Sequence, residues 1–267
     1  MTVNVQRNGS IWTVQINRPE ARNAVNPATA TLLFEAFLEF DADPNAVVAI
    51  FTGDQTAFCA GFDLKEAAEG MTPAWMTKHQ IPEDWSDPVV QPLPGPMGPS
   101  RLQLSKPVIA AIEGPAVAGG MELALWSDIR IASTSAYFGI YCRRWGVPLI
   151  DGGTVRLPAV VGQGRATDLV LTGRQVEAEE AYHIGLANRL CEPGKAYETA
   201  LDYAENILRF PQGCMLSDHR SARPTPEQLA KALRREWCSA DLILNEGAAG
   251  ASRFSSGKGR GGNFGDI

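Results

Sequence analysis

Residues 107–123 read PVIAAIEGPAVAGGMEL, an apolar run of strand length followed by a turn of small residues and the start of a helical pattern. The same order recurs at residues 46–64, which read AVVAIFTGDQTAFCAGFDL. Small residues in a turn let the backbone approach a ligand closely. Two such turns that converge in space aim two free backbone N–H groups at one oxygen atom. The two segments therefore predict an oxyanion hole, which is a site for carbonyl or thioester chemistry.

The composition is that of one principal globular domain that acts on a small partner. The chain has 267 residues, of which 45% are hydrophobic and 20% charged, enough for one sizeable core. Its formal net charge of -6 argues against a nucleic acid or an anionic membrane surface as the main partner. No window reaches the roughly 18 apolar residues of a membrane span. The five cysteines are widely spaced and odd in number, which predicts reduced thiols and a cytoplasmic location.

Periodicity along the chain predicts a β/α core followed by a helical third. Residues 3–7 and 11–17 alternate around Asn8-Gly9, which predicts a β-hairpin. The sequence predicts further strands at 128–132, 136–139 and 186–190, and helices at 27–41, 154–161, 165–172, 178–184, 195–210, 213–221, 226–246 and 247–254. The apolar face of the first helix comprises Leu32, Leu33, Ala36, Phe37 and Phe40.

Residues 70–105 differ from the rest of the chain because they are rich in proline and contain Trp75 and Trp85. A long connection of this kind is either a lid over a pocket or a surface loop. The sequence leaves both interpretations open.

Several catalytic motifs are absent from the sequence. His79, His183 and His219 stand apart from one another and from any cysteine cluster, which argues against a zinc site. There is no G-x-S-x-G motif of a serine hydrolase and no phosphate-binding loop of a nucleotide enzyme. Carboxylates near the two turns are therefore the main candidates for proton chemistry.

Two acidic residues stand out by position. Glu122 falls in the first turn of the helix that Gly119 opens, where the helix dipole is expected to lower the pKa of its carboxyl. Asp151 lies in the loop before the helix predicted at 154–161. The alternative interpretations are an ordinary acidic residue of a first helical turn for Glu122 and an N-terminal cap for Asp151.

Four segments occur in order along the chain: AGFDLK at 60–65, IEGPAVAGGMELA at 112–124, DIRIA at 128–132 and GGTVRLP at 152–158. Together they resemble the crotonase (enoyl-CoA hydratase/isomerase) superfamily, and the resemblance runs from about Val3 to Phe254. It implies an α/β fold, a crotonase-like spiral of repeated ββα units that forms a thioester-binding core over residues 1–192. A C-terminal helical trimerisation region over 193–256 would follow. The basic, Gly-rich composition of residues 257–267 predicts a flexible tail, which is either a disordered end or a segment that reaches the CoA phosphates of a neighbouring chain. The assembly implied is a homotrimer or a dimer of trimers.

The same resemblance assigns roles to particular residues. The backbone N–H groups of Phe62 and Gly119 correspond to the oxyanion-hole donors for the carbonyl of a CoA thioester. The residues implied in CoA binding are Arg22, Ala24, Ala60, Asp63, Leu64 and Lys65, with the adenine near Ala60, Asp63 and Leu64 and the phosphates near Arg22 and Lys65. Coenzyme A is implied only as part of the substrate, with no metal and no permanently bound cofactor.

The chain departs from the family at one catalytic position. Hydratases of the family hold a water between two glutamates, because water must lose a proton as the α-carbon gains one. Glu122 matches the first glutamate, and Cys142 stands where the second would be. Asp151 ranks above Cys142 as the assisting group, since a thiol is a poor proton donor unless its pKa is tuned. Arg143 or Arg144 would either bind a substrate carboxylate, which favours a polar acyl group or decarboxylation, or form an ion pair inside the core or at the trimer face.

From these observations we expect an enoyl-CoA hydratase that converts trans-2-enoyl-CoA and water to 3-hydroxyacyl-CoA in fatty-acid or related acyl-CoA metabolism. One alternative is an enoyl-CoA isomerase or an acyl-CoA decarboxylase, each of which needs only one acid/base. An alternative of another class is a non-catalytic acyl-CoA-binding protein that kept the thioester site and lost the chemistry.

Overall fold

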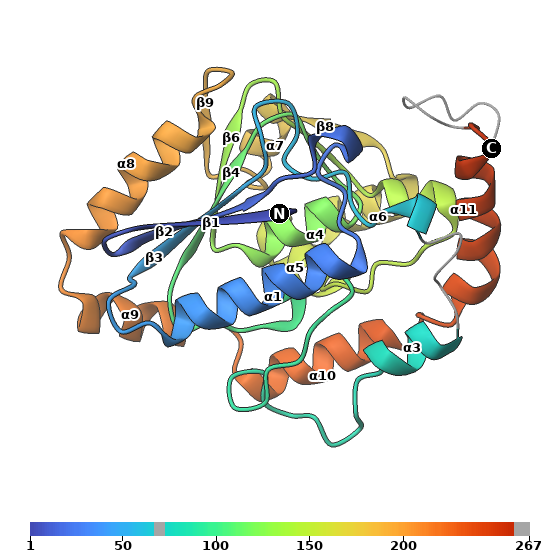
Figure 1. The fold of residues 1–267 in the computed structure, drawn as a ribbon, viewed down its shortest axis with the longest axis horizontal. Helices are drawn as coiled ribbons and strands as arrows, with labels where there is room; N and C mark the ends of the chain where they lie inside the picture. Colours follow the sequence, from blue (N-terminus) through green and yellow to red (C-terminus); the bar gives the residue numbers. More distant parts are fainter. Residues whose placement is uncertain (67–72, 259–267) are drawn as a thin grey trace.

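A mostly parallel six-stranded sheet forms the centre of the computed structural model, which describes residues 1–66 and 73–258 (Figure 1). The strand order is β1-β2-β3-β4-β6-β9. Only the β1–β2 hairpin is antiparallel, as Asn8-Gly9 predicted, and every other neighbouring pair is parallel. The strands are β1 (Val3–Asn8), β2 (Ile11–Ile16), β3 (Val48–Thr52), β4 (Val108–Ile112), β6 (Ile129–Ser133) and β9 (Arg189–Cys191).

A second, three-stranded sheet lies beyond the turns that follow β3 and β4. It consists of β5 (Pro115–Val117), β7 (Tyr137–Gly139) and β8 (Gln175–Glu177) in that order. β8 was not predicted from the sequence, because its three residues are too short to show a period. The predicted strand at 186–190 is displaced, since pairing with β6 selects Arg189–Cys191.

Helices cover both faces of the central sheet. α1 (Pro27–Ala42) packs through Leu33, Phe37 and Phe40, whereas Leu32, which was expected on the same face, is 36% exposed. α8 (Ala196–Leu208) covers the other face with Ala196, Ala200 and Ala204 against apolar side chains of the strands. The small alanines let this helix lie close to the sheet. The remaining helices of the core are α4 (Gly119–Trp126), α5 (Gly153–Val161), α6 (Gln163–Thr172) and α7 (Ala178–His183).

The C-terminal helices are α9 (Gln212–Ser221), α10 (Pro226–Trp237) and α11 (Ala248–Ser255). The single helix predicted at 226–246 is wrong, because α10 ends at Trp237 and a separate π-helical turn covers Ile243–Gly247. The tail that was predicted to be flexible lies, from residue 259 on, outside the described residues.

The proline-rich segment packs against α10, beside which α3 (Pro73–His79) lies in Figure 1. Trp75, Trp85 and Met76 are buried in one cluster with Leu229, Leu233 and Trp237 of α10. The segment from residue 73 onward is therefore part of the packed structure and not a surface loop; residues 67–72 lie outside the described residues.

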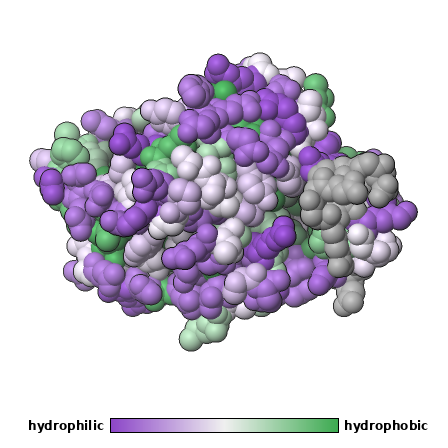
Figure 2. Space-filling model, turned by 90° about the horizontal axis from the view of Figure 1, so that it is seen from above, coloured by the Kyte–Doolittle hydropathy of each residue, from purple (hydrophilic) through white to green (hydrophobic). Residues whose placement is uncertain are grey.

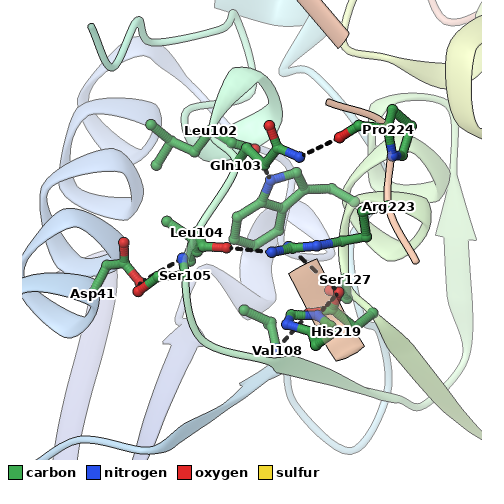
Figure 3. A network of polar contacts seen from close by, with 12 residues as sticks. Asp41, Leu102, Gln103, Leu104, Ser105, Val108, Ser127, His219, Arg223 and Pro224 are labelled. Atoms are coloured by element: carbon green, nitrogen blue, oxygen red, sulfur yellow. Dashed lines mark hydrogen bonds and ion pairs between the residues drawn. The ribbon is translucent and has the colours of Figure 1, made fainter. Parts of the chain in front are cut away.

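Polar contacts fasten the segment that enters α10 to the core (Figure 3). Arg223 donates from Nη2 to the carbonyl oxygen of Leu104 at 2.9 Å, and Gln103 donates from Nε2 to that of Pro224 at 2.8 Å. His219 of α9 contacts the Asp128 carboxylate through Nε2 at 2.7 Å. These contacts hold the segment before α10 against the core, and α10 itself begins at a capping box formed by Thr225 and Gln228.

The face of the molecule in Figure 2 is largely hydrophilic, with apolar side chains in small patches. Exposed large apolar side chains of the whole surface include Val90, Leu171, Leu208, Phe210 and Leu242. Within residues 1–66 and 73–258, none of the helices combines the length and apolar character needed to cross a lipid bilayer.

The two predicted turns meet because their backbones pair. Cys59 donates its N–H to the carbonyl of Pro115 at 3.0 Å and accepts from the N–H of Val117 at 3.1 Å. A Cβ atom at Gly61 would lie 3.1 Å from the nitrogen of Gly119, and one at Gly120 would lie 2.1 Å from the carbonyl oxygen of Cys59. Glycine at both positions is what permits this approach.

We expect Gly120→Ala to destabilise the fold by about 2 kcal/mol or more, because its Cβ cannot fit unless the Cys59 backbone moves. The matched control is Gly164→Ala on α6, where no atom lies within 4 Å of the new Cβ. That change should be neutral or stabilising by up to about 1 kcal/mol. Urea unfolding at equal protein concentration measures both, and equal midpoints for the two variants would contradict the packing described here.

Candidate active site

One cavity of about 710 Å³ opens where the two turns meet, and every residue predicted as a site residue lines it. The predicted residues in its wall are Arg22, Ala24, Ala60, Phe62, Asp63, Leu64, Lys65, Gly119, Glu122, Cys142 and Asp151. Trp75, Pro96 and Met97 of the proline-rich segment also line it. That segment therefore forms part of the cavity wall.

The backbone N–H groups of Phe62 and Gly119 are available to a ligand. Among the described residues, neither donates a hydrogen bond, although Asp63 beside Phe62 donates to the carbonyl of Val25 at 2.9 Å. Gly119 opens α4, so its N–H has no partner within the helix, and the helix N-terminus favours a negatively charged oxygen. Ala118 before it has a φ of 51°, unusual for alanine. The arrangement can stabilise an oxyanion.

Glu122 lies on α4 and is 3% exposed. Its Oε1 atom accepts hydrogen bonds from the N–H groups of Asp151 and Gly153, both at 2.9 Å. Its Oε2 atom has no donor among the described residues, and the side chain lines the cavity. One oxygen of Glu122 is thus fixed and the other is free for chemistry.

The pKa of Glu122 is raised well above its usual value, which corrects the expectation that the helix dipole lowers it. Burial is the largest cause, followed by the negative charges of Asp151 and Glu236. The hydrogen bonds from Asp151 and Gly153 act in the opposite direction and do not offset burial. A helix dipole contributes only about 0.3–1 kcal/mol at an exposed site, too little against removal from water next to two carboxyls.

Asp151 is also buried, at 3% exposure. Its Oδ1 atom accepts from the N–H of Met97 at 3.0 Å and from the Ser100 hydroxyl. Burial raises its pKa, while these two donors and Arg101 oppose the rise. Asp151 does not cap α5, whose first turn receives no side-chain cap from Gly152, the residue at the cap position. Its carboxyl is instead held by the proline-rich segment.

The two carboxyls behave as one acid/base pair. Each is buried and the charge of Asp151 raises the pKa of Glu122. The negative charge of one group therefore makes ionisation of the other less favourable, and the two do not titrate independently. Groups whose surroundings shift their pKa values in this way are suited to a reaction that takes one proton and gives another.

Cys142 lines the cavity from the 3-10 helix Tyr141–Trp145, but its thiol stays neutral. Burial raises its pKa to about 12, and the charge of Glu122 adds to the rise. Since the thiolate is the reactive form, Cys142 cannot act as a base at neutral pH. Arg143 and Arg144 do not line the cavity; they donate to the carbonyls of Val170 and Gly173.

Some residues of the site region were not predicted. Arg18 lines the cavity and its Nη2 atom donates to the Asp63 carboxylate at 3.0 Å. Glu236 lies behind the cavity on the apolar stripe of α10 with Leu229, Leu233 and Trp237. A glutamate on such a stripe is a signal that was available in the sequence. Ser100 gave no comparable signal, because nothing local connects it with Asp151.

Comparison with protein-family models matches residues 6–236 to the family described as enoyl-CoA hydratase/isomerase. The chain belongs to this family. Enoyl-CoA hydratase EchA19 of Mycobacterium tuberculosis is 38% identical over 210 residues, 76% of this chain and 73% of that protein. Carnitinyl-CoA dehydratase of Salmonella arizonae is 37% identical over 213 residues, 78% of this chain and 75% of that protein.

Solved structures agree with this assignment. EchA1_1 of Mycobacterium paratuberculosis has a TM-score of 0.80 at 29% identity and covers 94% of this chain and 95% of its own. A carnitinyl-CoA hydratase of Mycobacterium avium has a TM-score of 0.80 at 30% identity, with 96% of each chain covered. The predicted crotonase-like fold is thereby confirmed, and the protein is an acyl-CoA enzyme of the crotonase superfamily.

The raised pKa of Glu122 predicts how stability depends on pH. A folded-state pKa above the unfolded value of about 4.3 means that the folded protein binds the extra proton. Stability is therefore lost as pH rises above the unfolded value, until the pH passes the folded pKa. Glutamine resembles the protonated carboxyl and does not ionise, so Glu122→Gln should be more stable than wild type at pH 8.

We expect a gain of about 1 kcal/mol or more at pH 8, shrinking towards zero near pH 4. Thermal unfolding of both proteins across this range measures it. Glu205→Gln on α8, at an exposed position, reports any general effect of the substitution. A Glu122→Gln variant that is less stable than wild type at pH 8 would show that this carboxyl is not held protonated by its surroundings.

Proposed function

We propose that the protein is an enoyl-CoA hydratase, which adds water across the double bond of a trans-2-enoyl-CoA and catalyses the reverse reaction. The observation that carries the proposal is that two buried carboxyls, Glu122 and Asp151, line the same cavity as the two free N–H groups. Hydration needs these elements together: an oxyanion hole, a proton donor and a proton acceptor.

In the proposed mechanism, the thioester oxygen accepts hydrogen bonds from the N–H groups of Phe62 and Gly119. Negative charge develops on this oxygen as water attacks the β-carbon. Donors that already point at the oxygen stabilise that charge without reorganisation, and one such donor is worth about 10²–10³ in rate in a comparable site. The N-terminus of α4 at Gly119 adds to this effect.

Glu122 and Asp151 divide the proton transfers. Asp151, whose negative charge Ser100, the N–H of Met97 and Arg101 favour, takes a proton from water as the water oxygen bonds to the β-carbon. Glu122, held protonated by burial, delivers its proton from Oε2 to the α-carbon. The product gains the hydroxyl group of the water at its β-carbon and the proton of Glu122 at its α-carbon, while Asp151 keeps the proton that the water lost. The pair recovers its starting state when Asp151 passes that proton to Glu122. Asp151 thereby takes the place of the glutamate that Cys142 replaces.

The names of the relatives support addition or removal of water over isomerisation or decarboxylation. They are described as an enoyl-CoA hydratase and a carnitinyl-CoA dehydratase. Arg143 and Arg144 lie outside the cavity wall, which gives decarboxylation no carboxylate-binding group from this pair.

We assign CoA to the end of the cavity that Arg18, Arg22 and Lys65 line. Their charges suit the phosphates, and Ala24, Ala60, Asp63 and Leu64 suit the adenine. Proton transfer by carboxyls requires no metal and no permanently bound cofactor. We further propose a cytoplasmic location, in keeping with five free cysteines.

We also propose a homotrimer or dimer of trimers, assembled through residues 193–256 next to the core of residues 1–192, with residues 257–267 as a tail. Exposed apolar side chains at Leu208, Phe210 and Leu242 support this region as a contact surface.

The proposal is tested by turnover of trans-2-enoyl-CoA esters of increasing chain length, followed by the loss of absorbance of the conjugated thioester. Glu122→Gln and Asp151→Asn should each lower kcat by about 10²–10⁴, because each removes one proton transfer. Cys142→Ser should retain most of the wild-type kcat, since its thiol does not titrate.

An inactive Cys142→Ser variant beside a fully active Asp151→Asn variant would reverse the assignment of the second group. Tight binding of acyl-CoA esters by wild type, with no turnover of any enoyl-CoA, would favour the non-catalytic binding protein instead.

A further inference from the structure

The four residues 151–154, which lead into α5, donate their backbone N–H groups to two glutamates from different helices. The N–H groups of Asp151 and Gly153 donate to Oε1 of Glu122, both at 2.9 Å. Those of Gly152 and Thr154 donate to Glu236, at 2.6 and 2.8 Å. Four consecutive N–H groups therefore alternate between a carboxyl in the cavity wall and a carboxyl behind it.

Glu236 is placed for this role by α10 and has none of the features of a group that contacts substrate. It is 6% exposed and does not line the cavity. Both of its oxygens are occupied, because Oε2 accepts from Gly152 and Oε1 accepts from the N–H and the hydroxyl of Thr154. Burial raises the pKa of Glu236, and the hydrogen bonds from Gly152 and Thr154 act in the opposite direction. These three hydrogen bonds favour the carboxylate over its protonated form.

The other two carboxyls each keep one oxygen without a donor. Oε2 of Glu122 and Oδ2 of Asp151 receive no hydrogen bond among the described residues, and both side chains line the cavity. A proton held by the cluster therefore fits on these oxygens, whereas on Glu236 it would weaken the three hydrogen bonds that the ionised carboxylate accepts. The hydrogen bonds thus favour the negative charge on Glu236 and the proton on Glu122 or Asp151.

The remaining charged and titratable groups around the cluster do not change this division. Arg156 donates to the carbonyls of Asp151 and Ser100, and Arg101 donates to those of His79 and Pro94. Both arginines favour carboxylate charge by their field, and the attraction of Arg156 for Glu236 is one such contribution. Two nearby groups do not alter the charge of the cluster. Burial raises the pKa of the Cys142 thiol, which keeps it neutral, and burial lowers the pKa of His79, which disfavours its positive charge.

We propose that Glu236 is a positioning residue: as an ionised carboxylate it fixes the first turn of α5 and confines the exchangeable proton to the cavity-facing oxygens of Glu122 and Asp151. It acts through Glu122, whose pKa its charge raises. The catalytic meaning of this arrangement rests on the proposed hydratase reaction, but the location of the proton does not.

Infrared difference spectroscopy locates the proton without any substrate. At neutral pH, the spectrum of the wild type should show the band of a protonated carboxyl group. This band should disappear in at least one of the two variants Glu122→Gln and Asp151→Asn, and it should remain in Glu236→Asp. Absence of the band from wild type, or its persistence in both Glu122→Gln and Asp151→Asn, would overturn the proposal. These spectra test the location of the proton even if the Glu236→Gln variant fails to fold.

The charge of Glu236 is tested by the pH at which the band is lost. Glu236→Gln removes the charge and should lower that midpoint by about one pH unit or more. Glu236→Asp keeps the charge and should leave it near the wild-type value. An unmoved midpoint in Glu236→Gln would overturn the proposal, because a purely structural residue would not shift it in either variant.

Turnover gives a second readout. Glu236→Gln should lower kcat and move the alkaline limb of its pH profile to lower pH, with KM little changed because Glu236 does not line the cavity. Glu113→Gln is the matched control: Glu113 is also 6% exposed and accepts from the N–H of Ala196 at the start of α8. It should leave the profile unmoved, and an equal shift in the control would overturn the proposal.

The two proposals fail in different ways. Wild type that hydrates no enoyl-CoA but shows the expected infrared pattern removes the hydratase reaction and leaves Glu236 in its role. Wild type that is active, with a midpoint unaffected by Glu236→Gln, removes the role of Glu236 alone.

Discussion

The burial of three carboxyls around the first turn of α5 is the constraint on which the site depends. Glu122 comes from α4, Glu236 from α10 and Asp151 from the loop itself. Backbone N–H groups are the donors that hold the two glutamates, so neither can be moved without unpairing the start of α5. Burial raises the pKa of all three groups. Carboxyls whose pKa is raised by folding lower the stability of the folded protein as the pH rises, and in the proposed mechanism this is the cost of keeping a proton on Glu122.

In the proposed mechanism, Asp151 takes the role of the glutamate that is expected at the position of Cys142. Cys142 occupies a position where a glutamate is expected, and its buried thiol stays neutral. Asp151 lines the same cavity, and Met97 and Ser100 of the proline-rich segment hold its carboxyl. That segment packs on α10, which also carries Glu236. The same contacts therefore support both carboxyls, and the second acid/base need not come from the 3-10 helix.

Local patterns predicted the parts of the molecule that local forces determine. The hairpin at Asn8-Gly9 and the unit in which β4 leads through a turn of small residues into α4 follow from residues adjacent in the chain. Prediction was wrong where distant contacts decide: the pKa of Glu122 depends on Asp151 and Glu236, which are brought near only by folding. Ser100 had no local signal for the same reason. Glu236 did have a local signal, because it is a charged residue on an apolar helical face. Its burial beside α5 explains why a charged residue occurs on that face.

A crystal structure of the Asp151→Asn variant with a bound 3-hydroxyacyl-CoA tests the account most directly. The account predicts the thioester oxygen within about 2.7–3.1 Å of the backbone nitrogens of Phe62 and Gly119. It also predicts Oε2 of Glu122 beside the α-carbon and the side chain at position 151 beside the 3-hydroxyl group. A thioester oxygen bound away from both nitrogens, or a β-carbon that neither side chain approaches, would contradict it.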